Sequence, residues 1–147
     1  MTSAVRCILT DKQGFVWIGT KAGISRYDGH ELKKYVYSPN NPHSIPNNLI
    51  HQIAEDEMSN IWILTDKGIA RYQRQSDDFF LPTDEKGNPI IAYSTCLTKD
   101  GVLFGSKDKV YFYSYRDSSL RLLQKLNKGN NFNISLLLSL IHISEPT

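Results

Sequence analysis

The sequence has no long hydrophobic run and no targeting segment at its start. Apolar residues make up 40% of the chain. They never approach the roughly 20 consecutive positions that a membrane-spanning helix needs. The first residues, MTSAVRCILTD, lack the basic stretch and apolar core of a secretory signal peptide. A sustained helical period is also missing before Ser118, which excludes a helical repeat over most of the chain.

The groups that carry most enzyme chemistry are equally sparse. No glycine-rich loop follows a strand and opens a helix, so the chain has no phosphate-binding motif. The histidines have no Cys, His or carboxylate partner at metal-ligand spacing; they are His30, His43, His51 and His142. The sequence therefore predicts no metal, no cofactor and no catalytic residue in this segment.

Charge of one sign is not concentrated anywhere. The net charge is +2, and no basic cluster is present that would favour nucleic acid as a partner. Lys33 and Lys34 are expected to be a solvated pair. The acidic stretch EDE at residues 55–57 is expected to face solvent as part of a turn.

What the sequence does contain is a repeat. GFVWIGTKAGISRYDG, at residues 14–29, is answered by SNIWILTDKGIARYQR, at residues 59–74, at a constant spacing of about 45 residues. The motif positions are Trp17, Gly19, Thr20, Gly23, Arg26 and Tyr27 in the first copy, and Trp62, Thr65, Gly68, Arg71 and Tyr72 in the second. We predict that these residues are structural. An exposed Trp can stack on a sugar ring, but the recurrence of both Trp residues favours packing between repeats.

Each repeat reads as short strands joined by tight turns. FVWIGT and NIWILT are rich in β-branched and aromatic residues and are bounded by Asp, Asn, Ser and Gly. In the first copy we predict strands at residues 5–10, 15–20, 24–27 and 32–37. Four strands in about 45 residues correspond to one β-propeller blade.

A third copy, at residues 95–117, is degenerate. It has Leu103 nearest to the Trp position and a shorter first turn. We therefore predict an all-β partial β-propeller with two clear blades and one degenerate blade, each four-stranded and antiparallel, without a closed ring. The predicted units are residues 1–48, 49–89 and 90–126, followed by a tail at residues 127–147.

The two cysteines, Cys7 and Cys96, fall on the first strands of the first and third repeats. These strands belong to blades that are not neighbours, which argues against a disulfide. Each cysteine is expected to be a small buried residue.

The polar loop SPNNPHSIPNN, at residues 38–48, is the candidate ligand site. Such loops emerge at one face of a propeller, and rigid scaffolds often hold binding residues on loops. Its amide and imidazole groups suit a hydroxyl-rich ligand; they belong to Asn40, Asn41, His43, Asn47 and Asn48. The alternative is that the Pro and Asn residues only build the crossover between blades.

The motif of an acidic turn, Gly, an apolar residue, Trp-Ile-Gly-Thr, a second Gly and Arg-Tyr resembles the two-component regulator propeller repeat. That repeat fills the sensor regions of bacterial hybrid two-component regulators, best known from gut Bacteroidetes. The resemblance covers residues 5–72 strongly and 95–113 weakly. The second copy departs from the pattern at Asn60 and Leu64, where the family has Gly.

This resemblance implies that the segment is a fragment of the periplasmic sensor region of an inner-membrane parent with a histidine kinase core. It implies sensing of glycan-derived ligands to regulate polysaccharide utilisation. The implied partners are an oligosaccharide, the remaining blades of the parent, and a second parent chain in a homodimer. The alternative function is an interaction scaffold, or the platform of a secreted polysaccharide-active protein.

The last ten residues, LSLIHISEPT at 138–147, resemble the translation of a sequencing adapter. We expect them to be an artefact and not part of the repeat. The alternative is a genuine strand that opens a further blade.

Overall fold

The computed structural model describes residues 4–125, which form three four-stranded antiparallel sheets. The first sheet contains β1 (Cys7–Thr10), β2 (Val16–Thr20), β3 (Gly23–Tyr27) and β4 (Leu32–Tyr35). The second contains β5 (Ile50–Glu55), β6 (Ile61–Thr65), β7 (Gly68–Gln73) and β8 (Asp78–Phe80). The third contains β9 (Ser94–Leu97), β10 (Gly101–Gly105), β11 (Lys109–Ser114) and β12 (Ser119–Lys125).

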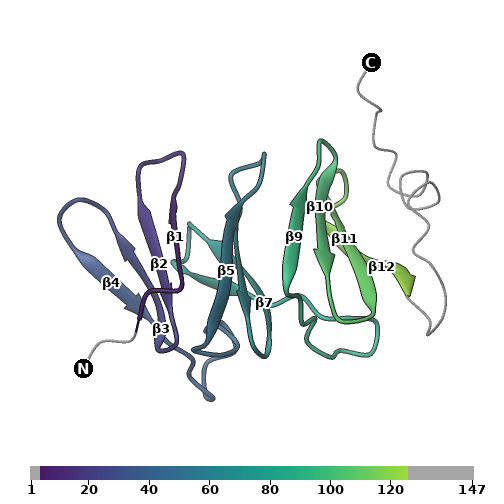
Figure 1. Ribbon diagram of the computed structural model, residues 1–147, viewed down its shortest axis with the longest axis horizontal. Helices are drawn as coiled ribbons and strands as arrows, with labels where there is room; N and C mark the ends of the chain where they lie inside the picture. The colour runs from purple at the N-terminus through teal and green to yellow at the C-terminus, as the bar shows by residue number, and fades with distance from the viewer. Residues whose placement is uncertain (1–3, 126–147) are drawn as a thin grey trace.

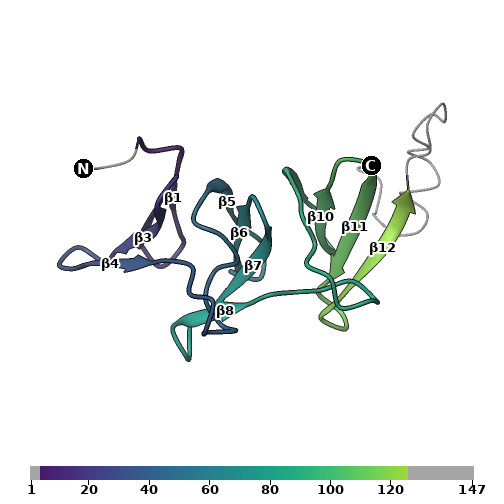
Figure 2. The ribbon, with the colours of Figure 1, turned by 90° about the horizontal axis from the view of Figure 1, so that it is seen from below.

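The sheets stand side by side in chain order, as Figure 1 shows. Within each sheet the strands follow one another in sequence order, so each sheet is an up-and-down meander. Figure 2 shows that the last strand of one sheet continues through a crossover segment to the first strand of the next. This all-β arrangement is that of a partial β-propeller, and the described sheets do not close into a ring. No helix that could cross a membrane occurs within residues 4–125.

The predicted strands of the first repeat agree with the observed ones to within one or two residues. β1 begins at Cys7 and β4 ends at Tyr35, each two residues inside the predicted range. Turn residues explain the ends of the other strands. Gly14 and Gly29 have φ values of 89° and 100°, a region that glycine adopts without strain, and they lie in the β1–β2 and β3–β4 turns.

The strand register shows which residues are equivalent in the three sheets. The prediction that Leu103 takes the place of the missing Trp is confirmed. Leu103 on β10 pairs with Phe112 on β11 at the same place in the register at which Trp17 and Trp62 each pair with an Arg. The equivalent pairs are Trp17 with Arg26, Trp62 with Arg71, and Leu103 with Phe112. The third sheet therefore lacks both the Trp and the Arg of the motif.

Two hydrophobic cores lie between successive sheets. The first contains Trp17, Ile24 and Tyr35 from the first sheet packed against residues of the second, among them Ile53, Ile61, Ile63, Tyr72 and Phe79. The second contains Trp62, Leu64 and Ile69 from the second sheet packed against residues of the third, among them Val102, Phe104, Tyr111 and Tyr113. The second sheet thus buries both of its faces, which explains why every residue of β6 is buried, whereas β2 alternates between buried and half-buried residues.

A close approach of backbone occurs where β7 begins. Gly68 has a φ of 152°, and a Cβ placed there would lie 3.3 Å from the Pro89 Cβ and 3.5 Å from the Pro46 Cγ. These prolines belong to the crossover segments on either side of the second sheet. Glycine at this position lets both segments pack against the start of β7.

The prediction that both cysteines are buried is wrong for Cys96. Cys7 is half-buried against the first core, whereas Cys96 is exposed, and both are free thiols. Cys96 pairs with Leu103, and alternation along β9 and β10 directs both away from the second sheet. The thiol therefore lies on the sheet face that no described sheet covers.

Candidate functional site

The candidate ligand loop, residues 38–48, bridges the first and second sheets. It lies in the crossover from β4 to β5. The Gly23 N–H donates to the Asn48 carbonyl at 2.8 Å, and the Phe79 N–H donates to the His43 carbonyl at 3.0 Å. One end of the loop is thus held at the β2–β3 turn, and its middle is held by the outer strand of the second sheet.

Three asparagine side chains in this loop hold its own backbone. Asn41 Oδ1 accepts the His43 N–H at 2.9 Å. Asn47 Oδ1 accepts the Leu49 N–H at 2.9 Å, and Asn48 Oδ1 accepts the Tyr37 N–H at 2.7 Å. The bonds of Asn41 and Asn47 are typical of Asx turns, in which a side-chain oxygen replaces a backbone acceptor, whereas the bond of Asn48 joins the two ends of the loop.

The remaining two site candidates, Asn40 and His43, are exposed, and their side chains do not hold the backbone of the loop. The side chains of Asn40 and His43 make no hydrogen bond to any residue within 4–125. Ser44 and Ile45 anchor the loop from beneath, since Ile45 is fully buried and the Ser44 hydroxyl accepts the Ser38 N–H at 3.0 Å. The loop therefore presents two polar side chains on a fixed backbone, and its role in binding stays a prediction.

The strongest polar contacts of the motif join an aspartate to each tryptophan. The Trp17 Nε1–H donates to Asp11 Oδ2 at 2.9 Å, and the Trp62 Nε1–H donates to Asp56 Oδ2 at 2.7 Å. Both indoles are fully buried. A buried indole N–H needs an acceptor, and a carboxylate is a strong one.

The expectation that the acidic stretch at residues 55–57 faces solvent is wrong for its central residue. Asp56 is 1% exposed. Its Oδ1 accepts the Met58 and Asn60 N–H groups, both at 2.9 Å, while Oδ2 accepts from Asn60 Nδ2 at 3.0 Å as well as from Trp62. The carboxylate closes the β5–β6 turn and fixes the indole at the same time. A fixed spacing from Asp to Trp in both clear repeats is the signal that would have revealed this.

A second pair of polar contacts crosses from each sheet to the next. Arg26 Nη1 donates to the Tyr72 hydroxyl at 2.5 Å, and Arg71 Nη1 donates to the Tyr113 hydroxyl at 3.0 Å. The Arg26 guanidinium also lies 5.0 Å from the centroid of the Phe15 ring. The Arg-Tyr part of the motif thus ties neighbouring blades together at their third strands.

The contact between the first two sheets contains a further carboxylate, Asp77. Its Oδ1 accepts the hydroxyls of Tyr35 and Tyr72 at 2.5 and 2.6 Å, and its Oδ2 accepts from Lys33. Burial opposes ionisation, but the hydrogen bonds from Lys33 and the two tyrosines outweigh it and hold the pKa of Asp77 at about 2. Burial, followed by the bond to Asp77, raises the pKa of Tyr35 above its ordinary value.

Replacing Asp77 with Asn should therefore cost stability at neutral pH and cost little in acid. Because the folded-state pKa is depressed, the contribution of Asp77 is present above about pH 4 and is lost as the pH falls toward 2. Asn tolerates the φ of 55° at this position, so the backbone is preserved. We expect a loss of about 1 kcal/mol at pH 7, since the side chain is partly solvated.

Urea unfolding of both proteins at pH 7 and pH 2.5 measures this difference. Asp108→Asn, at an exposed carboxylate, is the matched control. A deficit for Asp77→Asn that stays the same at both pH values would contradict the expected role of the ionised carboxylate.

Groups suited to a metal do not come together in the described part of the chain. Within residues 4–125, no cluster of three or more His, Cys, Asp or Glu side chains could hold an ion. His51 lies 3.3 Å from Asp66, and His30 is exposed in the β3–β4 turn. His142 and residues 138–147 lie outside the described residues.

Comparison with sequence families and solved structures supports the resemblance seen in the motif. Residues 1–22 match a family described as two component regulator propeller. No curated protein sequence matches the chain.

Among solved structures, the chain is similar to extracellular domains from B. thetaiotaomicron. One, described as belonging to the hybrid two-component system BT3049, has a TM-score of 0.68 and 18% identity over 92% of this chain and 19% of its own. Another, from BT4673, described as a hybrid two-component system, has a TM-score of 0.62 and 25% identity over 82% of this chain and 15% of its own. The chain thus spans less than a fifth of either structure.

Proposed function

We propose that this chain forms part of the extracytoplasmic β-propeller sensor region of a hybrid two-component regulator. The observation that carries the proposal is the agreement of two comparisons. The family match at residues 1–22 points to a two-component regulator propeller, and the sheets align with an extracellular domain of a hybrid two-component system at 25% identity. In this role the segment is a folded binding or relay module and not an enzyme.

The parent protein, in this proposal, is an inner-membrane histidine kinase whose sensor region lies in the periplasm and works as a homodimer. Its ligand is a glycan breakdown product, and its output controls polysaccharide-utilisation genes. The short span of this chain on its structural neighbours supports a longer parent, because each neighbour contains several times as many residues as are aligned here.

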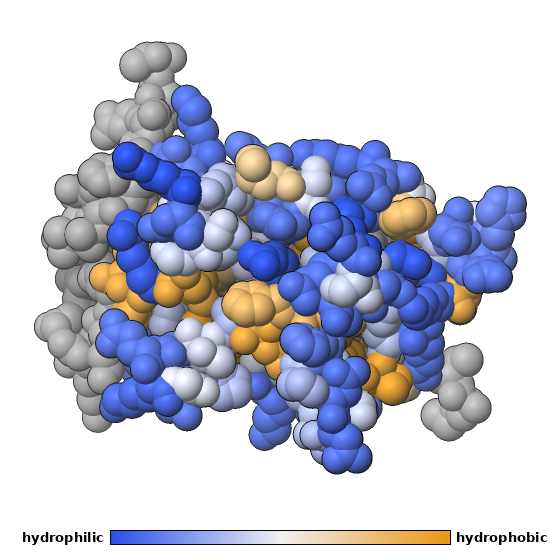
Figure 3. Space-filling model, turned by 180° about the vertical axis from the view of Figure 1, so that it is seen from behind, coloured by the Kyte–Doolittle hydropathy of each residue, from blue (hydrophilic) through white to orange (hydrophobic). Residues whose placement is uncertain are grey.

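The other blades of the parent are the proposed partners of the first sheet. Its face opposite the first core exposes Ile8 by 63%, Leu32 by 62% and Tyr27 by 42%. Figure 3, which views the molecule from behind, shows hydrophobic residues scattered among polar ones over that side. Tyr27 occupies the motif position at which Tyr72 and Tyr113 each accept a hydrogen bond from the Arg of the preceding sheet. The face therefore fits a preceding blade that carries Trp and Arg.

For the ligand, we retain the loop residues as candidates. Asn40 and His43 have the side chains best placed for a hydroxyl-rich molecule, because their polar groups are exposed and are not needed by the loop. Asn41, Asn47 and Asn48 would act through their amide nitrogens, since their oxygens hold the backbone.

Sequencing the source locus across the codon for Leu138 tests the proposal. We expect the reading frame to continue through further repeats to a membrane span and a histidine kinase, without encoding LSLIHISEPT. Calorimetric titration of the complete ectodomain with oligosaccharides then identifies the ligand. A genomic LSLIHISEPT followed by a stop codon would overturn the sensor assignment and favour the interaction scaffold.

A further inference from the structure

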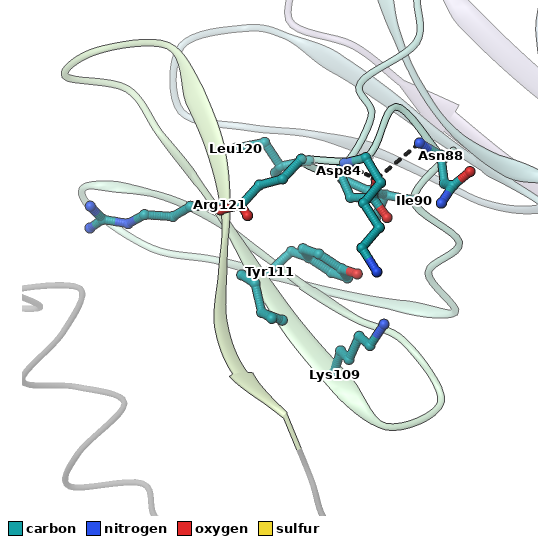
Figure 4. A pocket seen from close by; sticks show the side chains of 10 residues that line it. Asp84, Asn88, Ile90, Lys109, Tyr111, Leu120 and Arg121 are labelled. Carbon is teal, nitrogen blue, oxygen red and sulfur yellow. Dashed lines mark hydrogen bonds between the residues drawn. The ribbon is translucent and has the colours of Figure 1, made fainter.

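A hollow of about 340 Å³ lies between the crossover from β8 to β9 and the outer strands of the third sheet, as Figure 4 shows. Ile90, Tyr111, Leu120 and Leu122 supply apolar lining, and charged lining comes from the crossover and β11. The volume is that of a small-molecule site, which typically combines an apolar lining with a few placed polar groups. A second hollow of about 240 Å³ shares Asp84, Lys109 and Tyr111 with it.

The third blade departs from the repeat at two residues that line this hollow. In the first two blades the hydroxyls of Thr20 and Thr65 donate to the carbonyls of Gly23 and Gly68. In the third blade the Ser106 hydroxyl donates to the Lys109 carbonyl in the same way, so Lys109 occupies the position of these glycines. At Gly68 the crossovers approach to within contact of the backbone. At the equivalent position of the third blade, the Lys109 side chain lines the hollow.

Tyr111 is the second departure. Two residues after the glycine position, the first and second blades have Ser25 and Ala70. Blade packing therefore does not require a large side chain or a hydroxyl there. Tyr111 is 8% exposed, yet its hydroxyl makes no hydrogen bond to any residue within 4–125, although the ring is held in the second core. A phenol that opens to a hollow and whose O–H has no partner among the described residues is a group available to a ligand.

Two lysines line the hollow with this hydroxyl. Lys86 and Lys109 line the hollow, and neither ammonium forms an ion pair with a carboxylate of the described chain. In Figure 4 the hydroxyl end of Tyr111 and the Lys109 ammonium lie on the same side of the hollow, while the Arg121 guanidinium extends away from it. Two hydrogen-bond donors thus lie on one side of the hollow, and Lys86 adds a further positive charge to its lining, which suits an anionic oxygen group.

Carboxylate acceptors also line the hollow. Asp84 Oδ1 accepts the Lys86 and Asn88 N–H groups, both at 2.9 Å, and these bonds lower the pKa of Asp84. The crossover is held in shape by this ionised side chain, whose Oδ2 has no hydrogen bond to any described residue. Glu85 also lines the hollow. These carboxylates would repel a bare inorganic anion but accept hydroxyl groups of an organic one.

We propose that this hollow binds a compact polyhydroxylated organic acid, such as a hexuronate. Its carboxylate contacts Lys86, Lys109 and the Tyr111 hydroxyl, its hydroxyls donate to Asp84, and its carbon frame lies over the apolar lining. The assignment does not depend on the proposed sensor function, because it rests only on the residues that line this hollow.

Saturation-transfer NMR and calorimetric titration of the full chain with D-galacturonate test the site, with D-galactose as the neutral counterpart of the same shape. We expect saturable binding of galacturonate that is about tenfold or more tighter than that of galactose, as expected for a hydrogen-bonded charge. Tyr111→Phe keeps the ring and removes the hydroxyl, and Lys109→Met keeps the stem and removes the charge. Each should weaken galacturonate binding about tenfold.

Lys99→Met is the matched control, because Lys99 is exposed and does not line the hollow. Circular dichroism of each variant confirms that the fold is kept. No binding of galacturonate, equal binding of galactose, or equal losses in Lys99→Met and Lys109→Met would each overturn the proposal.

Discussion

Replacing Asp56 with Ala will lower the free energy of unfolding by about 3 to 5 kcal/mol, because it leaves several buried donors without an acceptor. Asp56 accepts four hydrogen bonds, from the N–H groups of Met58 and Asn60, the Asn60 amide and the Trp62 indole. The indole is fully buried against the third sheet and cannot turn to water. A loss of this size is comparable to the whole stability of a small domain.

Urea unfolding followed by circular dichroism measures the effect. Asp108→Ala, at an exposed carboxylate, is the matched control and should change stability by no more than about 0.5 kcal/mol. If Asp56→Ala behaves like that control, the carboxylate is dispensable and the turn closes by other means.

The blade architecture could be predicted from the sequence because it recurs. Two copies of one motif in a single register fix which residues are equivalent, and short runs of β-branched and aromatic residues bounded by turn residues fix the strands. The recurrence of Trp17 and Trp62 also separates packing from binding. Each indole lies in a core between two sheets, in T-shaped contact with a tyrosine of the next sheet at 4.7 and 4.9 Å between ring centroids.

The features that sequence reasoning missed depend on which face of a sheet is covered. Cys7 and Cys96 look alike in the sequence, but only Cys7 has a neighbouring sheet against it. The acidic turn looks solvated, yet Asp56 turns inward because the indole N–H needs a partner. Lys109 and Tyr111 become visible as unusual only when the strand register shows that they replace a glycine and a small residue.

The third blade shows that the aspartate and the tryptophan form one unit. Thr98 occupies the turn position of Asp11 and Asp56, and Leu103 occupies the position of the indole. The Thr98 hydroxyl donates to the Gly101 carbonyl at 2.9 Å and accepts the Gly101 N–H at 3.0 Å, so threonine closes this shorter turn alone. Because the third blade has no indole N–H, a carboxylate buried at the position of Thr98 would lose its hydration and would have one hydrogen-bond donor fewer than Asp56 has.

Copying the third blade into the second should therefore show a coupling between the two substitutions. We expect Asp56→Thr and Trp62→Leu each to destabilise the chain by about 3 kcal/mol, the first through an unsatisfied indole N–H and the second through a cavity and a buried carboxylate short of a donor. The double variant has neither the indole nor the charge, so its loss should be about 1 to 2 kcal/mol smaller than the sum.

Asp56→Thr combined with Trp17→Leu is the control pair. The Trp17 indole bonds to Asp11 and not to Asp56, so the losses of these two substitutions should add. Urea unfolding of the three single variants, Asp56→Thr, Trp62→Leu and Trp17→Leu, and of the two double variants measures both sums. Additive losses for the Asp56 and Trp62 pair would mean that the aspartate serves the turn alone, and that its absence from the third blade is unrelated to the loss of the tryptophan.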